Sequence, residues 1–154
     1  MAGCAAAYVT PAHQHPHFVC ETCGTVECLE RSQIPPTFVR SLKVANGYDV
    51  HYRLWGPEHA DEVVVILHGG MSHSLWQRPL AQAICARSDL AVFAPDRRGC
   101  GLNDGRGDLG SADRSILDVE EHLRHLGERY QRVHLAGWCQ GAQYAAVAAQ
   151  HLQD

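Results

Sequence analysis

The segment Gly137-Trp138-Cys139-Gln140-Gly141 has the residue types and spacing of a turn that presents a nucleophile between a strand and a helix. Such a turn is tight and strained, so small residues are needed two positions before and two positions after the nucleophile. Gly137 and Gly141 meet that requirement. Cys139 would stand at a helix N-terminus, where backbone N–H groups and the helix dipole stabilise a thiolate. The pattern therefore predicts covalent chemistry through the Cys139 thiol.

A second glycine-rich loop, His68-Gly69-Gly70-Met71, follows a predicted strand about 70 residues before this turn. Acyl transfer needs two hydrogen-bond donors that converge on the developing oxyanion. We predict that one donor is the N–H of Gln140, directly after the nucleophile, and that the other is the N–H of Gly70 or Met71. The two loops together indicate one active site more strongly than either loop alone.

These two motifs, together with the loop Asp96-Arg97-Arg98-Gly99-Cys100-Gly101-Leu102-Asn103, resemble the N-terminal half of the α/β-hydrolase superfamily over residues 40–154. The resemblance implies a nucleophile elbow at Cys139; serine is the more frequent nucleophile, and members such as dienelactone hydrolases use cysteine. It also implies that Asp96 and Arg98 shape the turn after their strand, as in lysophospholipase-like and proline-iminopeptidase-like members. No cofactor is implied for this part of the chain.

The resemblance further implies a catalytic acid and a catalytic histidine, which follow the nucleophile in the family order. His151 and Asp154 are the only such residues after Cys139. Both lie about a dozen residues along the predicted helix, which at about 1.5 Å per residue is too far from the thiol. His68 is an alternative base by position, although the family places it in the oxyanion loop. Without a base, Cys139 would form a covalent adduct and turn over poorly.

The N-terminal segment is dense in cysteine and histidine, and Cys20-Glu21-Thr22-Cys23-Gly24 has the spacing of a zinc knuckle. The segment resembles, over about 25 residues, the dimerisation domain of ferric-uptake-regulator repressors. That resemblance implies structural zinc on Cys20 and Cys23, a regulatory metal near His15 and His17, and a homodimer. The family's DNA-binding domain has no counterpart here, so we expect no nucleic-acid binding. Cys28 is a further potential metal ligand.

We place a domain boundary after Ile34-Pro35-Pro36-Thr37, which separates residues 1–38, the segment expected to bind metal, from residues 39–154. Strands are predicted on both sides of Asn46-Gly47, the strongest short hairpin signal. The apolar runs Val63–Leu67 and Leu90–Ala94 are typical of strands buried in a parallel sheet. The predicted strands are Leu42–Val44, Val50–Leu54, Val63–Leu67, Leu90–Ala94 and Val133–Ala136.

Helices are predicted between the later strands and at the end of the chain, over Ser74–Arg87, Ser111–Tyr130 and Ala142–Leu152. The first has a stripe of Leu75, Leu80, Ala83 and Ile84, with Pro79 at its centre. The second has Ile116, Val119, Leu123 and Leu126 on one face, and Asp113 and Asp118 near its positive end. The alternation predicts an α/β fold, a partial α/β-hydrolase fold with a mostly parallel sheet and an N-terminal antiparallel hairpin.

The composition bounds the function and the location. A chain of 154 residues that is 45% hydrophobic is expected to form a packed core, and a formal charge of -4 gives no reason to seek nucleic acid or an anionic membrane. No apolar run reaches the roughly 20 residues of a membrane span, and the N-terminus lacks the basic start of a secretory signal, so we expect a cytoplasmic protein. Seven cysteines, an odd number, exclude a complete internal disulfide framework.

Three functions remain open. The first is a hydrolase or acyltransferase that acts on a small-molecule ester, thioester or amide through Cys139. The second is a metal-binding dimerisation module, and the third is a non-catalytic remnant, because a truncated or fused reading frame would explain two partial families in one chain. Arg97 and Arg98 are interpreted as a solvated face or an anion site. Residues expected to be inert or to serve packing are Cys4, Cys85, Cys100, His51, His59, His73, His122, His125, His134 and Trp138.

Overall fold

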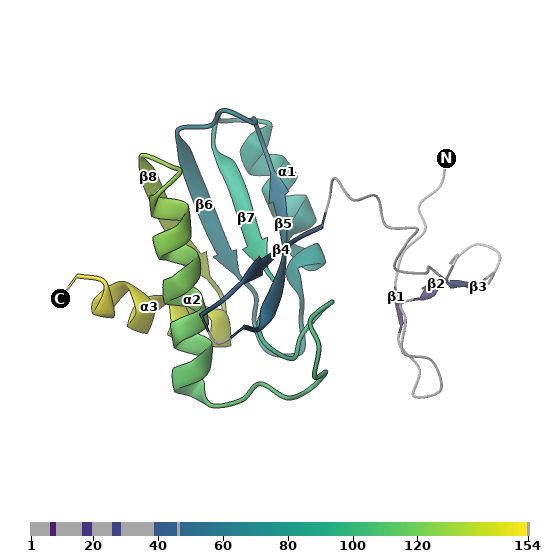
Figure 1. Ribbon diagram of the computed structural model, residues 1–154. Coiled ribbons are helices and arrows are strands. Elements are labelled where there is room, and N and C mark those ends of the chain that lie inside the picture. The colour runs from purple at the N-terminus through teal and green to yellow at the C-terminus, as the bar shows by residue number, and fades with distance from the viewer. Residues whose placement is uncertain (1–6, 9–16, 20–25, 29–38, 46, 154) are drawn as a thin grey trace. The chain divides into compact units, whose positions relative to one another are not determined.

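The computed structural model describes residues 7–8, 17–19, 26–28, 39–45 and 47–153. The chain divides into two compact units, Met1–Thr37 and Phe38–Asp154. In the first unit, short antiparallel strands form a sheet in the order β1-β2-β3 (Figure 1). These strands are β1 (Ala7–Tyr8), β2 (His17–Val19) and β3 (Val26–Cys28).

The second unit is built on a mixed sheet with strand order β4-β5-β7-β6-β8. Strand β5 pairs antiparallel with β4 and β7, whereas β6 pairs parallel with β7 and β8. The predicted α/β architecture, with an antiparallel hairpin before a parallel part, is therefore confirmed. The strands are β4 (Arg40–Lys43), β5 (Asp49–Trp55), β6 (Glu62–Leu67), β7 (Ala91–Pro95) and β8 (Arg132–Gly137).

The pairing of β6 with β8 brings two loops to the same edge of the sheet. The last residues of the two strands, Leu67 and Gly137, are partners in parallel register. The N–H of Trp138 continues the pairing by donating to the Leu67 carbonyl at 3.4 Å. The loop that follows β6 and the turn that follows β8 therefore begin side by side, although 70 residues separate Leu67 from Gly137 in the register.

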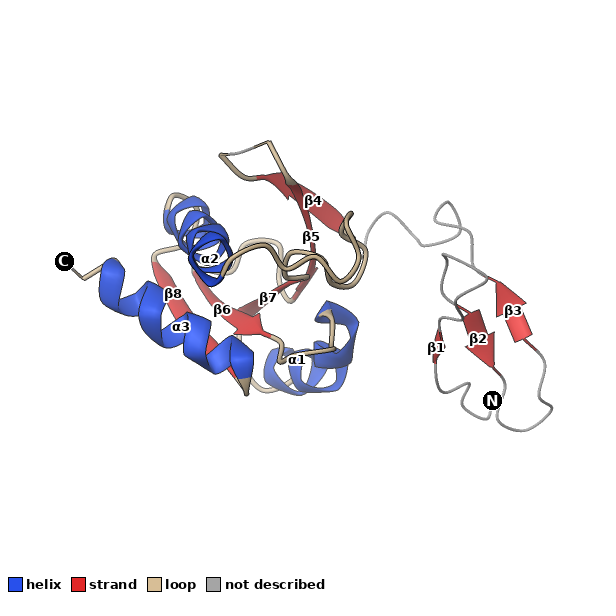
Figure 2. Ribbon diagram, turned by 90° about the horizontal axis from the view of Figure 1, so that it is seen from below, coloured by secondary structure: helices blue, strands red, loops and turns tan. Residues whose placement is uncertain are grey.

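Helices cover both faces of this sheet, giving three layers (Figure 2). Alternate β6 residues, Val63, Val65 and Leu67, pack on one face with side chains from α2 and α3. On the other face, Ile66 packs with Ala81 of α1. Both sets are buried, as an apolar strand between two helical layers requires. The helices are the 3-10 helix η2 (Ser74–Gln77), α1 (Arg78–Cys85), α2 (Ala112–Gly127) and α3 (Gln140–His151).

The first predicted helix is wrong in detail, because Pro79 divides it. Residues Ser74–Gln77 form η2, and α1 starts anew with Pro79 in its first turn, where the missing N–H costs no hydrogen bond. The new start changes the buried face: Leu80, expected inside, is 39% exposed, and Ala81 is fully buried instead.

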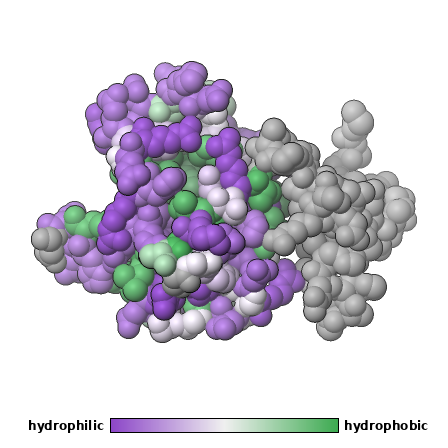
Figure 3. All heavy atoms as spheres, in the orientation of Figure 1, coloured by the Kyte–Doolittle hydropathy of each residue, from purple (hydrophilic) through white to green (hydrophobic). Residues whose placement is uncertain are grey.

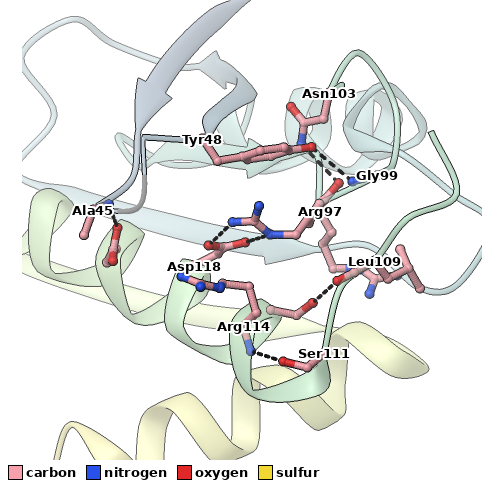
Figure 4. Close-up of polar contacts among 12 residues, drawn as sticks. Ala45, Tyr48, Arg97, Gly99, Asn103, Leu109, Ser111, Arg114 and Asp118 are labelled. Atoms are coloured by element: carbon pink, nitrogen blue, oxygen red, sulfur yellow. Dashed lines mark hydrogen bonds and ion pairs between the residues drawn. The ribbon is translucent and has the colours of Figure 1, made fainter. Parts of the chain in front are cut away.

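The second predicted helix is confirmed as α2, with a defined cap. The Ser111 side chain accepts a hydrogen bond from the N–H of Arg114 at 3.1 Å (Figure 4). Val119 and Leu126 are buried as predicted. Asp118 differs from the expectation, because its carboxylate pairs with Arg98 rather than only favouring the positive end of the helix.

The surface of the second unit that faces the viewer in Figure 3 is mostly hydrophilic, with apolar side chains in small separate groups. Within the described ranges, none of the helices combines the length and the apolar character that crossing a membrane demands.

Candidate active site

The turn between β8 and α3 holds Cys139 in a strained backbone conformation, with φ 53° and ψ −127°. A positive φ is uncommon for a residue with a side chain, and such strain is found where a site requires it. Cys139 is an exposed free thiol at the N-cap of α3. The structure thus places the predicted nucleophile at the predicted strand-to-helix turn.

The two flanking glycines leave no room for a side chain. A Cβ atom on Gly137 would lie 2.7 Å from the carbonyl carbon of Gly141. A Cβ atom on Gly141 would lie 2.4 Å from the carbonyl oxygen of Leu67. Because both obstacles are backbone atoms, neither can move aside cheaply. The first turn of α3 therefore demands glycine at position 137, and the crossing of α3 over the end of β6 demands it at position 141.

The loop after β6 lies against this turn. A Cβ atom on Gly69 would lie 3.2 Å from Cβ of Cys139, and one on Gly70 would lie 3.7 Å from the side-chain oxygen of Gln140. The Gln140 N–H is in the first turn of α3, where intrahelical acceptors are missing. Met71 continues the loop with φ 50° and a fully exposed side chain. Cys139, Gly70 and Gln140 are therefore brought together.

His68 is a buried, neutral residue of this loop rather than a base. Its Nε2 accepts the N–H of Arg97 at 2.9 Å, and its Nδ1–H donates to the Gly69 carbonyl at 2.8 Å. Burial is the main cause that lowers the pKa of His68 to about 4. Since the only lone pair of the ring is already used, His68 has nothing with which to accept the thiol proton.

The loop after β7 is held by its own charged residues, as expected for Asp96 and Arg98. The buried Asp96 carboxylate accepts the N–H of Ser74 at 2.6 Å and that of Leu102 at 3.0 Å. Arg98 donates to Asp118 of α2 through two hydrogen bonds of 2.9 and 2.7 Å. The interpretation of Arg97 and Arg98 as a solvated face is wrong, because Arg97 is 6% exposed and Arg98 is largely covered.

Neighbouring contacts complete the loop after β7. The Asn103 amide donates to the carbonyl oxygens of Asp96 at 2.7 Å and Arg97 at 3.1 Å. The Gly99 N–H donates to the Tyr48 hydroxyl at 3.2 Å, and Figure 4 shows this ring beside the loop. The loop is therefore anchored to the β4–β5 hairpin as well as to α2.

No histidine or carboxylate of the described residues forms a hydrogen bond with Cys139. His151 ends α3 and contacts Glu120 of α2 at 2.8 Å, so it does not serve the thiol, in line with its predicted distance. His73 packs edge-on against Trp76, and burial lowers its pKa. Among the described residues, the exposed Cys139 thiol therefore has no base hydrogen-bonded to it.

The sequence did not single out three further contacts. Arg97 Nη2 donates to the Gly69 carbonyl at 2.8 Å, and the Arg97 guanidinium lies 5.2 Å from the ring centre of Tyr144 in α3. The Tyr144 hydroxyl accepts the side-chain N–H of Gln140 at 2.9 Å. The spacing of four between Gln140 and Tyr144 on a helix is a signal that could have shown this pair.

The metal ligands predicted in the N-terminal unit are untested. Cys20, Cys23 and His15 lie outside the described residues. His17 and Cys28 are described as positions on β2 and β3, where they are paired across the two strands. Among the residues that the structure does describe, no group of three potential ligands could hold a metal ion.

Residues 64–152, more than half of the chain, match the alpha/beta hydrolase family, and this match does not include the segment that resembles ferric-uptake regulators. A proline iminopeptidase from Lactobacillus acidophilus is 25% identical over 104 residues, which are 66% of this chain and 35% of that protein.

Two solved structures share the fold. Est1E from Butyrivibrio proteoclasticus, with ferulic acid bound, is similar with a TM-score of 0.66 and 19% identity, over 75% of this chain and 48% of that one. An epoxide hydrolase from Vigna radiata is similar with a TM-score of 0.57 and 23% identity, over 74% of this chain and 34% of that one. The chain spans about a third to a half of the length of these relatives. It belongs to the alpha/beta hydrolase family.

Proposed function

We propose that Cys139 is the nucleophile of a reaction on the acyl carbon of an ester, thioester or amide, leading to hydrolysis or acyl transfer. The observation that carries the proposal is the exposed Cys139 at a strained turn, with Gln140 beginning the helix behind it and the Gly69-Gly70 loop lying against both. The thiolate forms a C–S bond to the acyl carbon, and the carbonyl oxygen becomes an oxyanion that these N–H groups stabilise. Collapse of the tetrahedral intermediate expels the leaving alcohol, thiol or amine and leaves a thioester on Cys139.

The described residues favour acylation over turnover. Hydrolysis of the thioester needs a base to activate water, and no described residue is positioned beside Cys139 for that role. We therefore expect the acyl adduct to accumulate. The relatives bear on the acyl group: the name proline iminopeptidase favours an amide, and the ferulic acid bound to Est1E favours an aromatic acid. An acyl carbon is common to both.

The proposal is tested by treating the whole chain with p-nitrophenyl acetate and locating the acetyl group by peptide mass spectrometry. We expect acetylation of Cys139 to exceed that of Cys85, which is half-buried and whose pKa burial raises. Cys139→Ala should abolish the main adduct, and the matched variant Cys85→Ala should keep it. Equal acetylation of the two cysteines in the wild-type chain contradicts the proposal.

A further inference from the structure

Arg97 is a buried guanidinium without a carboxylate partner among the described residues. It is 6% exposed, and the ion pairs of neighbouring arginines, Arg53 with Asp96 and Arg98 with Asp118, do not include it. Its Nε and Nη1 atoms have no hydrogen-bond partner in the described part of the chain. Burial of an unpaired charge is costly, so this placement requires an explanation.

Within the described part of the chain, the guanidinium makes one hydrogen bond, to the backbone of the loop after β6. The Gly69 carbonyl accepts Arg97 Nη2–H at 2.8 Å and His68 Nδ1–H at 2.8 Å. The peptide bond from Gly69 to Gly70 is trans, so its plane carries the carbonyl and the Gly70 N–H in opposite directions. Two donors that fix the Gly69 carbonyl therefore also fix the direction of the Gly70 N–H.

Arg97 also contacts the helix that carries the second donor. Its guanidinium lies 5.2 Å from the ring centre of Tyr144, and the Tyr144 hydroxyl is bonded to the Gln140 side chain. The Arg97 backbone N–H meanwhile holds the His68 ring. One residue thus links the loop after β7, the loop that carries Gly70, and the helix that begins at Gln140.

We propose that Arg97 is a positioning residue of the oxyanion hole: it orients the Gly69–Gly70 peptide so that the Gly70 N–H donates to an oxyanion formed on Cys139. This inference rests on the proposed acyl chemistry. The uncompensated positive charge of Arg97 adds to the effect, since a fixed charge in a water-poor site stabilises developing negative charge.

Two probes of Cys139 separate this role from a merely structural one. With p-nitrophenyl acetate the thiolate forms a thioester through an oxyanion and expels p-nitrophenolate. With iodoacetamide the thiolate displaces iodide and forms a thioether without an oxyanion. Both rates are measured on the whole chain by mass spectrometry of the Cys139 peptide, for the wild type, Arg97→Met, Arg97→Lys and the exposed control Arg87→Met.

We expect Arg97→Met to slow acylation by at least about 10-fold. The effect should be smaller than the loss of about 100-fold or more that follows removal of an oxyanion donor itself. Alkylation by iodoacetamide should stay close to the wild-type rate, Arg97→Lys should recover part of the acylation rate, and Arg87→Met should change neither. An unchanged acylation rate, or an equal fall of both rates, overturns the inference. If Arg97→Met does not fold, Arg97→Gln takes its place, because its shorter, uncharged side chain is polar but is not expected to reach the Gly69 carbonyl, and the same loss of acylation is expected.

A readout that does not depend on catalysis is the amide of Gly70 in ¹⁵N relaxation. Arg97→Met is expected to lower its order parameter from the rigid range, about 0.85, towards about 0.6. If the wild-type chain does not acylate at all, the proposed function fails, and this measurement alone decides the positioning role. An order parameter equal to that of the wild type then contradicts it.

Discussion

At the scale of single residues, the turn at Cys139 can form only because Gly137 and Gly141 have no side chains. The carbonyl groups of Leu67 and His68 occupy the space that a Cβ atom on Gly141 would need, at 2.4 and 2.5 Å. The sequence showed that small residues were required at this spacing. It did not show which atoms impose the requirement, because the approach of α3 to the end of β6 is a tertiary contact.

Gly141→Ala should lower the free energy of unfolding by about 2–3 kcal/mol or more, because the new methyl group meets backbone atoms in a packed site. The matched control is Gly127→Ala in α2, where a Cβ atom meets nothing within 4 Å. That control should be neutral or stabilising by up to about 1 kcal/mol, since alanine is the better helix former. Urea unfolding measures both, and similar effects of the two variants would contradict this account.

Two buried histidines make stability depend on pH. Burial lowers the pKa of His68 and of His122 from 6.5 to about 4. Both must be neutral in the folded state, so the unfolded chain binds more protons between these values, and stability falls as the pH decreases from 6.5 towards 4. The slope approaches about 1.4 kcal/mol per pH unit for each histidine.

This dependence is measured by urea unfolding at a series of pH values. His122→Leu removes one of the two titrating groups and should make the slope shallower. A free energy of unfolding that stays constant from neutral pH to the folded pKa of about 4 would show that the two histidines are not buried in neutral form.

At the scale of elements, the strands and most helices could be predicted because their apolar periodicity is set by burial on a sheet. The first helix could not, because its division depends on where Pro79 falls relative to η2. Arg97 and Arg98 looked alike in the sequence, yet one reaches Gly69 and the other Asp118. The two neighbouring side chains contact different elements, and two adjacent residues of one type in a sequence do not reveal that.

The Arg98–Asp118 pair joins the loop after β7 to α2 with side chains that are 11% and 9% exposed. Arg98→Met should cost about 3–5 kcal/mol, because it leaves a covered carboxylate without its partner. Arg98→Met combined with Asp118→Leu should recover part of that loss. Urea unfolding of the single and double variants gives the coupling free energy, and purely additive losses would rule out a stabilising pair.

Zinc binding by the N-terminal unit remains a prediction from the sequence. We expect purified chain to contain zinc bound through Cys20 and Cys23, because two thiolates at this spacing suit one tetrahedral ion. The double variant Cys20→Ser with Cys23→Ser should lose the zinc, and Cys85→Ser should retain it. Elemental mass spectrometry measures the zinc content per chain. A wild-type chain without zinc, or a double variant with the same zinc content as the wild type, would refute this prediction.

At the scale of the whole molecule, the chain matches only about a third to a half of the length of the relatives it resembles. Three short motifs identified the family from the sequence, because the turn after β8, the loop after β6 and the loop after β7 are each set by local backbone demands. The approach of the loop after β6 to the turn at Cys139 was predicted, whereas the contacts of Arg97 with both could not be, since they depend on the strand order that places β6 between β7 and β8. The site is therefore a property of the sheet as much as of its motifs.

The most direct test of the central claim is the burst of p-nitrophenolate released when the whole chain meets excess p-nitrophenyl acetate. If the turn after β8 presents an activated thiol beside two N–H donors, the burst should amount to about one equivalent per chain, with slow release afterwards, as expected of an accumulating acyl-enzyme. Cys139→Ala should abolish the burst. A wild-type chain without a burst, or a burst that survives Cys139→Ala, would contradict the account.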